Sequence, residues 1–110
     1  MIKVYNLEDL NRELNKNKTV LALFYSTWCP YCIRFLPVFN KKASNTRIKD
    51  IVHVILDDYD DPIWDVYSIP AVPTIILFDN GQVCKRLDAR LGRGLSEERF
   101  LEWIEEFNSQ

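Results

Sequence analysis

The feature that most constrains the fold of this chain is a nearly continuous apolar run from Thr19 to Tyr25. A run of this length suits a strand, and a strand without a polar face must be covered on both sides. A second apolar run, Ile51 to Leu56, ends in Asp57 and Asp58. The two runs predict an α/β fold, with helices packed on both faces of a central sheet.

The strongest local signal is an Asn-Gly pair between two strand-like segments. Thr74 to Phe78 and Val83 to Leu87 flank the residues Asp79-Asn80-Gly81-Gln82. Asn-Gly favours the tight turn of an antiparallel hairpin. Neighbouring strands that are joined through helices should instead be parallel, with right-handed crossovers. The sheet is therefore predicted to be mixed.

The remaining segments complete a β-α-β-α-β-α-β-β-α order. A short edge strand is expected at Ile2 to Tyr5, and helices at Leu7 to Lys16 after an Asn6 N-cap, Pro30 to about Ser44, Pro62 to about Ser68, and from Ser96 onward. The second helix is predicted to bury Ile33, Leu36, Phe39 and Ala43, and Pro37 inside it should kink it.

Composition limits the classes of function. The 110 residues are 47% hydrophobic, which predicts one domain over residues 1–110. The formal net charge is -2, with Lys and Arg spread along the chain, so neither a nucleic-acid nor a membrane partner is expected. The N-terminal residues lack the pattern of a signal peptide, and no apolar run reaches the roughly 18 residues of a membrane span. A cytoplasmic monomer is the expectation.

Three cysteines are too few for a disulfide framework, and two of them, Cys29 and Cys32, lie three residues apart. Structural zinc normally needs four Cys or His ligands. The chain offers only these two with Cys84 and His53, and it has no second paired spacing. We therefore expect no metal and no cofactor.

The pair Cys29-Pro30-Tyr31-Cys32 lies at a predicted strand-to-helix junction. A cysteine at a helix N-terminus has free amides and the helix dipole beside it, and both stabilise a thiolate. This makes Cys29 the candidate nucleophile, and Cys32, one helical turn on, the candidate resolving thiol. If both were simply buried core cysteines, the helix-starting Pro30 and the flanking Trp28 and Tyr31 would be coincidences.

With these residues, the sequence resembles the thioredoxin family over nearly its whole length. Four features match in order: Phe24-Tyr25-Ser26-Thr27-Trp28-Cys29, Pro37 eight residues after Cys29, Val72-Pro73-Thr74, and the Asp79-to-Val83 hairpin. The resemblance implies a thioredoxin fold and a protein thiol–disulfide oxidoreductase whose redox-active disulfide joins Cys29 and Cys32.

The resemblance also implies a site for disulfide-containing protein substrates. Pro73 would follow a cis peptide, leaving the Val72 main chain free to pair with an extended substrate. Trp28, Pro30, Tyr31, Val72 and Pro73 are the expected substrate contacts. A thioredoxin reductase-like enzyme or glutathione would supply the electrons.

Three departures from the family pattern stand out. The dipeptide between the cysteines is Pro-Tyr, as in glutaredoxins, which favours a potential above thioredoxin's roughly -270 mV. Leu23 stands where thioredoxins have a buried Asp that exchanges protons with the resolving thiol, so another group or water must serve Cys32. The segment Arg90-Leu91-Gly92-Arg93-Gly94 makes the link to the last helix about four residues longer than in thioredoxin, near the expected substrate groove.

Three alternatives remain open. A glutathione-dependent glutaredoxin-like reductase is the nearest, although no Gly-Gly pair with acidic residues follows the hairpin. Arg34 would be its contact for a glutathione carboxylate, but a charge on an exposed helix face is the simpler interpretation of that residue. An interaction module would use the apolar rim as a docking surface, with redox chemistry incidental; that rim is Trp28, Tyr31, Ala71, Val72 and Pro73. A carrier could share an Fe–S cluster between two chains.

Three further features are assigned structural roles. Cys84 is expected to be a small buried hydrophobe without catalytic function. His53, inside an apolar run, is expected to be a hydrogen-bonded core histidine rather than a proton shuttle. The acidic residues lack the pattern of a calcium loop and are expected to form a solvated loop; they are Asp57, Asp58, Asp60 and Asp61.

Overall fold

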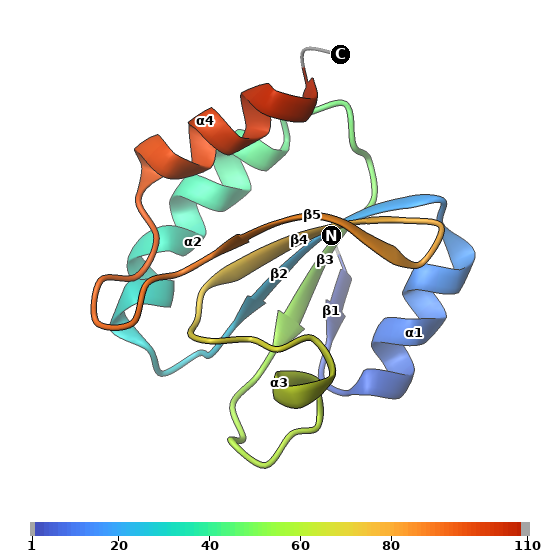
Figure 1. Ribbon diagram of the computed structural model, residues 1–110, viewed down its shortest axis with the longest axis horizontal. Helices are drawn as coiled ribbons and strands as arrows, with labels where there is room; N and C mark the ends of the chain where they lie inside the picture. Colours follow the sequence, from blue (N-terminus) through green and yellow to red (C-terminus); the bar gives the residue numbers. More distant parts are fainter. Residues whose placement is uncertain (1, 109–110) are drawn as a thin grey trace.

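The computed structural model describes residues 2–108 and has the predicted element order. The strands are β1 (Ile2–Val4), β2 (Thr19–Tyr25), β3 (Ile51–Ile55), β4 (Thr74–Asp79) and β5 (Gln82–Asp88). The helices are α1 (Leu7–Lys16), α2 (Pro30–Ala43), α3 (Ile63–Val66) and α4 (Glu97–Asn108). Figure 1 shows α2 and α4 on one face of the sheet and α1 and α3 on the other, which confirms the α/β architecture.

The strand order β1-β3-β2-β4-β5 makes β2 the central strand. It pairs in parallel with β3 and antiparallel with β4, so the sheet is mixed, as predicted. Although α1 joins β1 to β2, these strands are not neighbours, because β3 lies between them. The register pairs Tyr25 with Ile55 and Phe24 with Thr74. The ends of β2 and β3 and the start of β4 therefore meet at one edge of the sheet.

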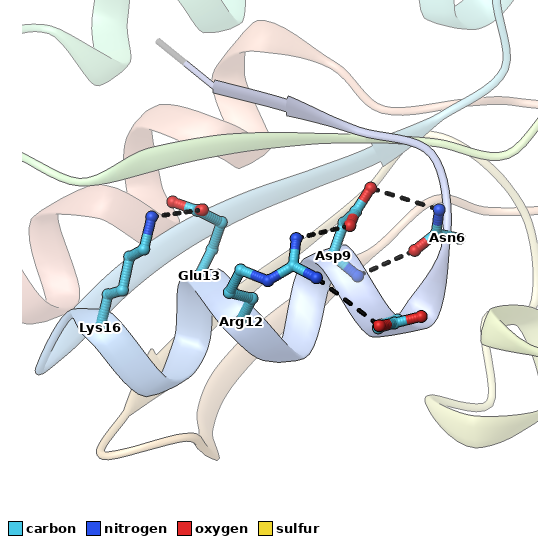
Figure 2. Close-up of polar contacts among 6 residues, drawn as sticks. Asn6, Asp9, Arg12, Glu13 and Lys16 are labelled. Carbon is cyan, nitrogen blue, oxygen red and sulfur yellow. Dashed lines mark hydrogen bonds and ion pairs between the residues drawn. The ribbon is translucent and has the colours of Figure 1, made fainter.

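Helix α1 begins where the sequence predicted. The side chain of Asn6 accepts a hydrogen bond from the Asp9 amide at 2.8 Å, which satisfies one of the free donors of the first turn (Figure 2). Arg12 lies 2.9 Å from Asp9, and Lys16 lies 3.4 Å from Glu13 (Figure 2). Pairs of this spacing on a helix surface each contribute a few tenths of a kcal/mol.

The buried face of α2 differs from the predicted stripe at its first turns. Cys32 and Phe35 are buried in place of Ile33, which is 55% exposed, and Leu36, which is only partly buried. Phe39 and Ala43 are buried as predicted. The 3.6-residue period of a helix is compatible with a buried stripe that begins at Cys32 or at Ile33. The packing of α2 on the sheet selects the stripe that begins at Cys32.

The β4–β5 hairpin has the predicted two-residue Asn-Gly turn. Asp79 pairs with Gln82, and both Asn80 and Gly81 have positive φ, at 52° and 79°. The expectation that Cys84 is buried is wrong, because its side chain is exposed. The register steps from Phe78↔Val83 to Leu77↔Lys85, so Cys84 is the extra residue of a β-bulge.

His53 lies in the core beneath α2. Its Nδ1 atom lies 3.1 Å from the Tyr25 hydroxyl, and its ring meets Phe39 edge-on at a centroid distance of 5.7 Å. The buried Nε2 atom has no hydrogen-bond partner among the described residues, so the expected hydrogen bonding is only half satisfied. Burial, with a smaller contribution from the nearby Lys3, lowers the pKa of the His53 imidazole to about 4.

The lowered pKa predicts acid sensitivity. Between about pH 6.5 and 4 the unfolded chain binds a proton at His53 that the folded protein does not, so the free energy of unfolding falls as the pH falls. The full loss is about 3 kcal/mol. We expect urea titrations between pH 4 and 7 to show this slope, and His53→Leu to remove it. An identical slope in both proteins would contradict the assignment.

Candidate active site

Cys29 lies at the junction of β2 and α2. It is the N-cap residue of α2, Pro30 follows in the first turn, and the Cys29 carbonyl accepts the amide of Ile33 at 3.0 Å. The side chain makes no capping hydrogen bond and is 7% exposed. The free amides and the dipole of a helix N-terminus favour a negative charge here, which is the property that a thiolate nucleophile needs.

Cys32 lies one turn further on and is 1% exposed. The pKa of the Cys32 thiol is raised to about 12, chiefly by burial. A hydrogen bond to the main chain of Ser26 opposes this rise, whereas the hydrogen-bonded Cys29 thiol and the negative charge of Asp57 add to it. The two cysteines thus differ in their surroundings: Cys29 opens toward the surface, and Cys32 stays protonated behind it.

The segment before Cys29 is held by Asp57, the second residue after β3. Its carboxylate accepts the Thr27 amide at 2.7 Å and the Thr27 hydroxyl at 2.8 Å. Its carbonyl accepts the indole N–H of Trp28 at 3.2 Å. Asp57, Asp58 and Asp60 are exposed, as expected of a solvated loop, but Asp57 also positions the active-site segment.

A groove of about 240 Å³ opens beside Cys29. Three aromatic side chains line part of it: Trp28 and Tyr59 have ring centroids 5.4 Å apart, and Tyr59 and Trp64 are stacked at 5.9 Å. The remaining lining comes chiefly from Tyr31, from Pro70 to Val72 and from Arg90 to Gly92. A concave, largely apolar surface beside a candidate nucleophile suits a peptide-like substrate.

The predicted substrate contacts do not all lie in this groove. Trp28, Tyr31 and Val72 line it, whereas Pro30 is exposed at the start of α2 and Pro73 is buried, and neither is part of the lining. The peptide bond between Val72 and Pro73 is cis, as the resemblance implied. The Val72 main chain has no hydrogen bond within the described residues.

Sequence reasoning missed Tyr59, Trp64 and the role of Asp57. All three follow β3, and β3 runs parallel to β2. The carboxyl ends of neighbouring parallel strands meet at one sheet edge, so residues after Leu56 had to come near residues after Tyr25. The two aromatic residues in that segment, Tyr59 and Trp64, were the sequence signal that could have placed it at the site.

Neither a metal-ion cluster nor a membrane-spanning helix occurs in the described part of the chain. Residues 2–108 contain no cluster of three or more His, Cys, Asp or Glu side chains that could hold a metal ion. No helix in the same range is long and apolar enough to cross a membrane.

Comparison with known proteins identifies the family. The family model "Thioredoxin" matches residues 1–106. The chain belongs to the thioredoxin family. A thioredoxin of Mycoplasma genitalium is 33% identical over 84 residues, which cover 76% of this chain and 81% of that protein. The crystal structure of reduced Schistosoma mansoni thioredoxin is 26% identical with a TM-score of 0.73, covering 96% of each chain.

Longer relatives also match. The "Bifunctional thioredoxin reductase/thioredoxin" of Mycobacterium leprae is 34% identical over 80 residues, which cover 73% of this chain and 18% of that protein. The chain spans less than half the length of the first curated relatives it matches. It has the thioredoxin fold and the Cys-x-x-Cys pair of a thioredoxin-type thiol–disulfide oxidoreductase.

Leu23, six residues before Cys29 in β2, is where this chain departs from the buried Asp of the thioredoxin pattern. It is 1% exposed and pairs across the sheet with His53, so both side chains lie on the same face of the sheet. The pKa of His53, lowered to about 4, leaves that ring neutral at pH 7. An imidazole with so low a pKa is a weak base for a thiol whose pKa is about 12.

We therefore expect attack by Cys32 to be limited by loss of its proton. Below the Cys32 pKa, the thiolate fraction and the rate of mixed-disulfide resolution rise about tenfold per pH unit, as seen by stopped-flow Trp fluorescence between pH 6 and 9. Leu23→Asp should speed resolution at pH 7 and cost at least about 1–3 kcal/mol of stability. A pH-independent native rate, or lost stability without a gain in rate, would count against the scheme.

Proposed function

We propose that this protein is a protein thiol–disulfide oxidoreductase that works by dithiol–disulfide exchange, with Cys29 as nucleophile and Cys32 as resolving thiol. The observation that carries the proposal is the asymmetry of the pair. Cys29 caps a helix and lines the groove, whereas Cys32 is buried within hydrogen-bonding reach of it. One thiol is thus placed to meet a substrate, and the other to meet only its partner.

The reaction proceeds in two exchanges. The Cys29 thiolate attacks one sulfur of a substrate disulfide, that disulfide breaks, and the leaving sulfur takes up a proton. Cys32 then loses its proton and attacks the Cys29 sulfur of the mixed disulfide, which releases the second substrate thiol. Two electrons pass to the substrate, and the protein is left with a Cys29–Cys32 disulfide. The same steps run backwards oxidise a dithiol.

The substrate is a protein segment in an extended conformation. The groove beside Cys29 is apolar and aromatic along Trp28, Tyr59 and Trp64. The unbonded Val72 main chain next to it can pair with such a segment as a short strand. Pro30 and Pro73 are also expected to contact substrate, and they follow Cys29 and Val72 directly in the sequence.

The electron donor is a thioredoxin reductase-like enzyme. The Mycobacterium leprae relative carries both names, reductase and thioredoxin, in one protein. We assign residues 1–110 to a single domain that acts as a monomer in the cytoplasm, where thiols are kept reduced. Three cysteines, too few for a disulfide framework, fit that setting.

The roles of the two cysteines are tested by serine variants with insulin disulfides as substrate. Cys29→Ser should lower turnover to background, because no nucleophile remains. Cys32→Ser should trap a mixed disulfide through Cys29, visible by mass spectrometry. In the reduced native protein, Cys29 should be alkylated before Cys32 near pH 7, because Cys29 lines the groove whereas Cys32 is 1% exposed. Cys84→Ser is the matched control and should retain native turnover. Equal residual turnover in the Cys29 and Cys32 variants would refute the two-step scheme.

The effect of the Pro-Tyr dipeptide between the cysteines is tested by measuring the reduction potential and by comparing two electron donors. We expect a potential between about -230 and -200 mV, above the roughly -270 mV of thioredoxin. We also expect a thioredoxin reductase to reduce the oxidised protein faster than glutathione does at millimolar concentration. Faster reduction by glutathione, with a glutathione adduct on Cys29, would favour the glutaredoxin-like alternative.

A further inference from the structure

The segment from Arg90 to Gly94 folds back on itself as a closed turn. The Arg90 amide donates to the Gly94 carbonyl at 3.1 Å, and the Gly94 amide donates to the Arg90 carbonyl at 3.0 Å. The amide of Arg93 also donates to the Arg90 carbonyl, at 2.9 Å. These residues, called the arginine turn below, therefore form a defined structure rather than a loose connection to α4.

The arginine turn is fastened to the dipeptide between the two cysteines. The Tyr31 hydroxyl donates to the Gly92 carbonyl at 2.7 Å, across 61 positions of sequence. Gly94 is buried against the same side chain: a Cβ atom there would lie 2.7–2.9 Å from Tyr31 carbons, closer than such atoms approach. Gly94 also has φ of 69°, a conformation that favours glycine.

This attachment makes the arginine turn a wall of the groove. Arg90, Leu91 and Gly92 line it together with Cys29, and Leu91 is 88% exposed. The aromatic wall of Trp28 and Tyr59 lines the same groove. In Figure 1 the turn between β5 and α4 lies beside the start of α2, and the segment between β3 and α3 extends from the same end of the sheet.

Charge distinguishes the two walls. Arg90 and Arg93 are exposed on the turn. Arg90 lines the groove, whereas Arg93 and Arg34 line an adjacent hollow that shares Tyr31 with the groove and also includes Glu97. The Arg34 guanidinium lies 5.1 Å from the Tyr31 ring centroid. None of the three forms an ion pair with a carboxylate within residues 2–108. The segment beside the aromatic wall instead carries exposed carboxylates, among them Asp58 and Asp60.

We propose that the arginine turn, with Arg34, selects substrates: the preferred partners are extended protein segments that carry an acidic side chain next to the reacting cysteine. Guanidinium groups bind carboxylates through two parallel hydrogen bonds, and none of these three lies within ion-pair distance of a carboxylate in residues 2–108. The inference rests on the proposed function, because it concerns the substrate of that same groove.

The net charge of the protein makes the proposal sharply testable. At -2, the overall charge would attract basic substrates, so a preference for acidic ones has to come from the local arginines. The probes are peptide disulfides with Gln on both flanks of the reacting cysteine, and versions with Glu or Lys on one flank or the other. The readout is kcat/KM for the first reduction by the native protein.

We expect at least one Glu peptide to exceed its Gln parent by about two- to fivefold, and the matching Lys peptide to fall below it. The ratio should shrink as salt is raised from 20 to 500 mM. Arg90→Gln and Arg93→Gln should each lower the Glu/Gln ratio. Lys41→Gln, which removes one exposed positive charge from the last turn of α2, should leave both the ratio and the Gln rate unchanged.

Tyr31→Phe tests the attachment of the turn, because it keeps the ring and removes the hydroxyl that holds Gly92. A lower Glu/Gln ratio supports this positioning role, and an unchanged ratio overturns it. Turnover of all peptides without a preference for Glu would overturn substrate selection and leave the proposed function standing. Failure to reduce any peptide or insulin would overturn the proposed function itself.

Discussion

The pairing of β2 on both of its sides is the constraint on which the rest of the structure depends. Parallel pairing with β3 and antiparallel pairing with β4 bring the end of β2 beside the end of β3 and the start of β4. Cys29, Asp57 and Val72 lie on three segments far apart in sequence, and each leaves or enters the sheet at that edge. A one-residue slip of β2 would turn its buried side chains to the other face and separate these groups.

The chemistry of the pair follows from burial more than from charged neighbours. The two thiols lie one helical turn apart, yet only Cys29 faces the groove, and burial is the largest cause of the raised pKa of Cys32. The same core holds Leu23 and a neutral His53 side by side. Burial and the negative charge of Asp57 both raise the pKa of Cys32, so its thiol stays protonated at neutral pH.

The groove shows how loops can add specificity to a shared scaffold. Its Cys-x-x-Cys pair and its cis Val72-Pro73 bond fit the thioredoxin family, to which this chain belongs. The aromatic stack of Tyr59 and Trp64 and the arginine turn come from the connections between elements. Both are anchored to the active-site segment, the first through Asp57 and Trp28 and the second through Tyr31.

Local interactions account for what the sequence by itself determined. The Asn6 cap, the Asn80-Gly81 turn and the limits of β2 depend on neighbouring residues, so they were predicted with their residues. The strand-to-helix position of the cysteines was predicted on the same basis, and the family resemblance gave the cis Pro73.

Only the tertiary structure decided how distant segments meet. Placement of β3 between β1 and β2 depends on the whole sheet. The side of α2 that faces inward depends on how that helix packs, so the sequence predicted burial of Ile33, whereas the structure buries Cys32. The bulge that exposes Cys84 reflects a register that two strands set together. The contact of Tyr31 with Gly92 and Gly94 joins residues about sixty positions apart, and periodicity carries no information about such a distance.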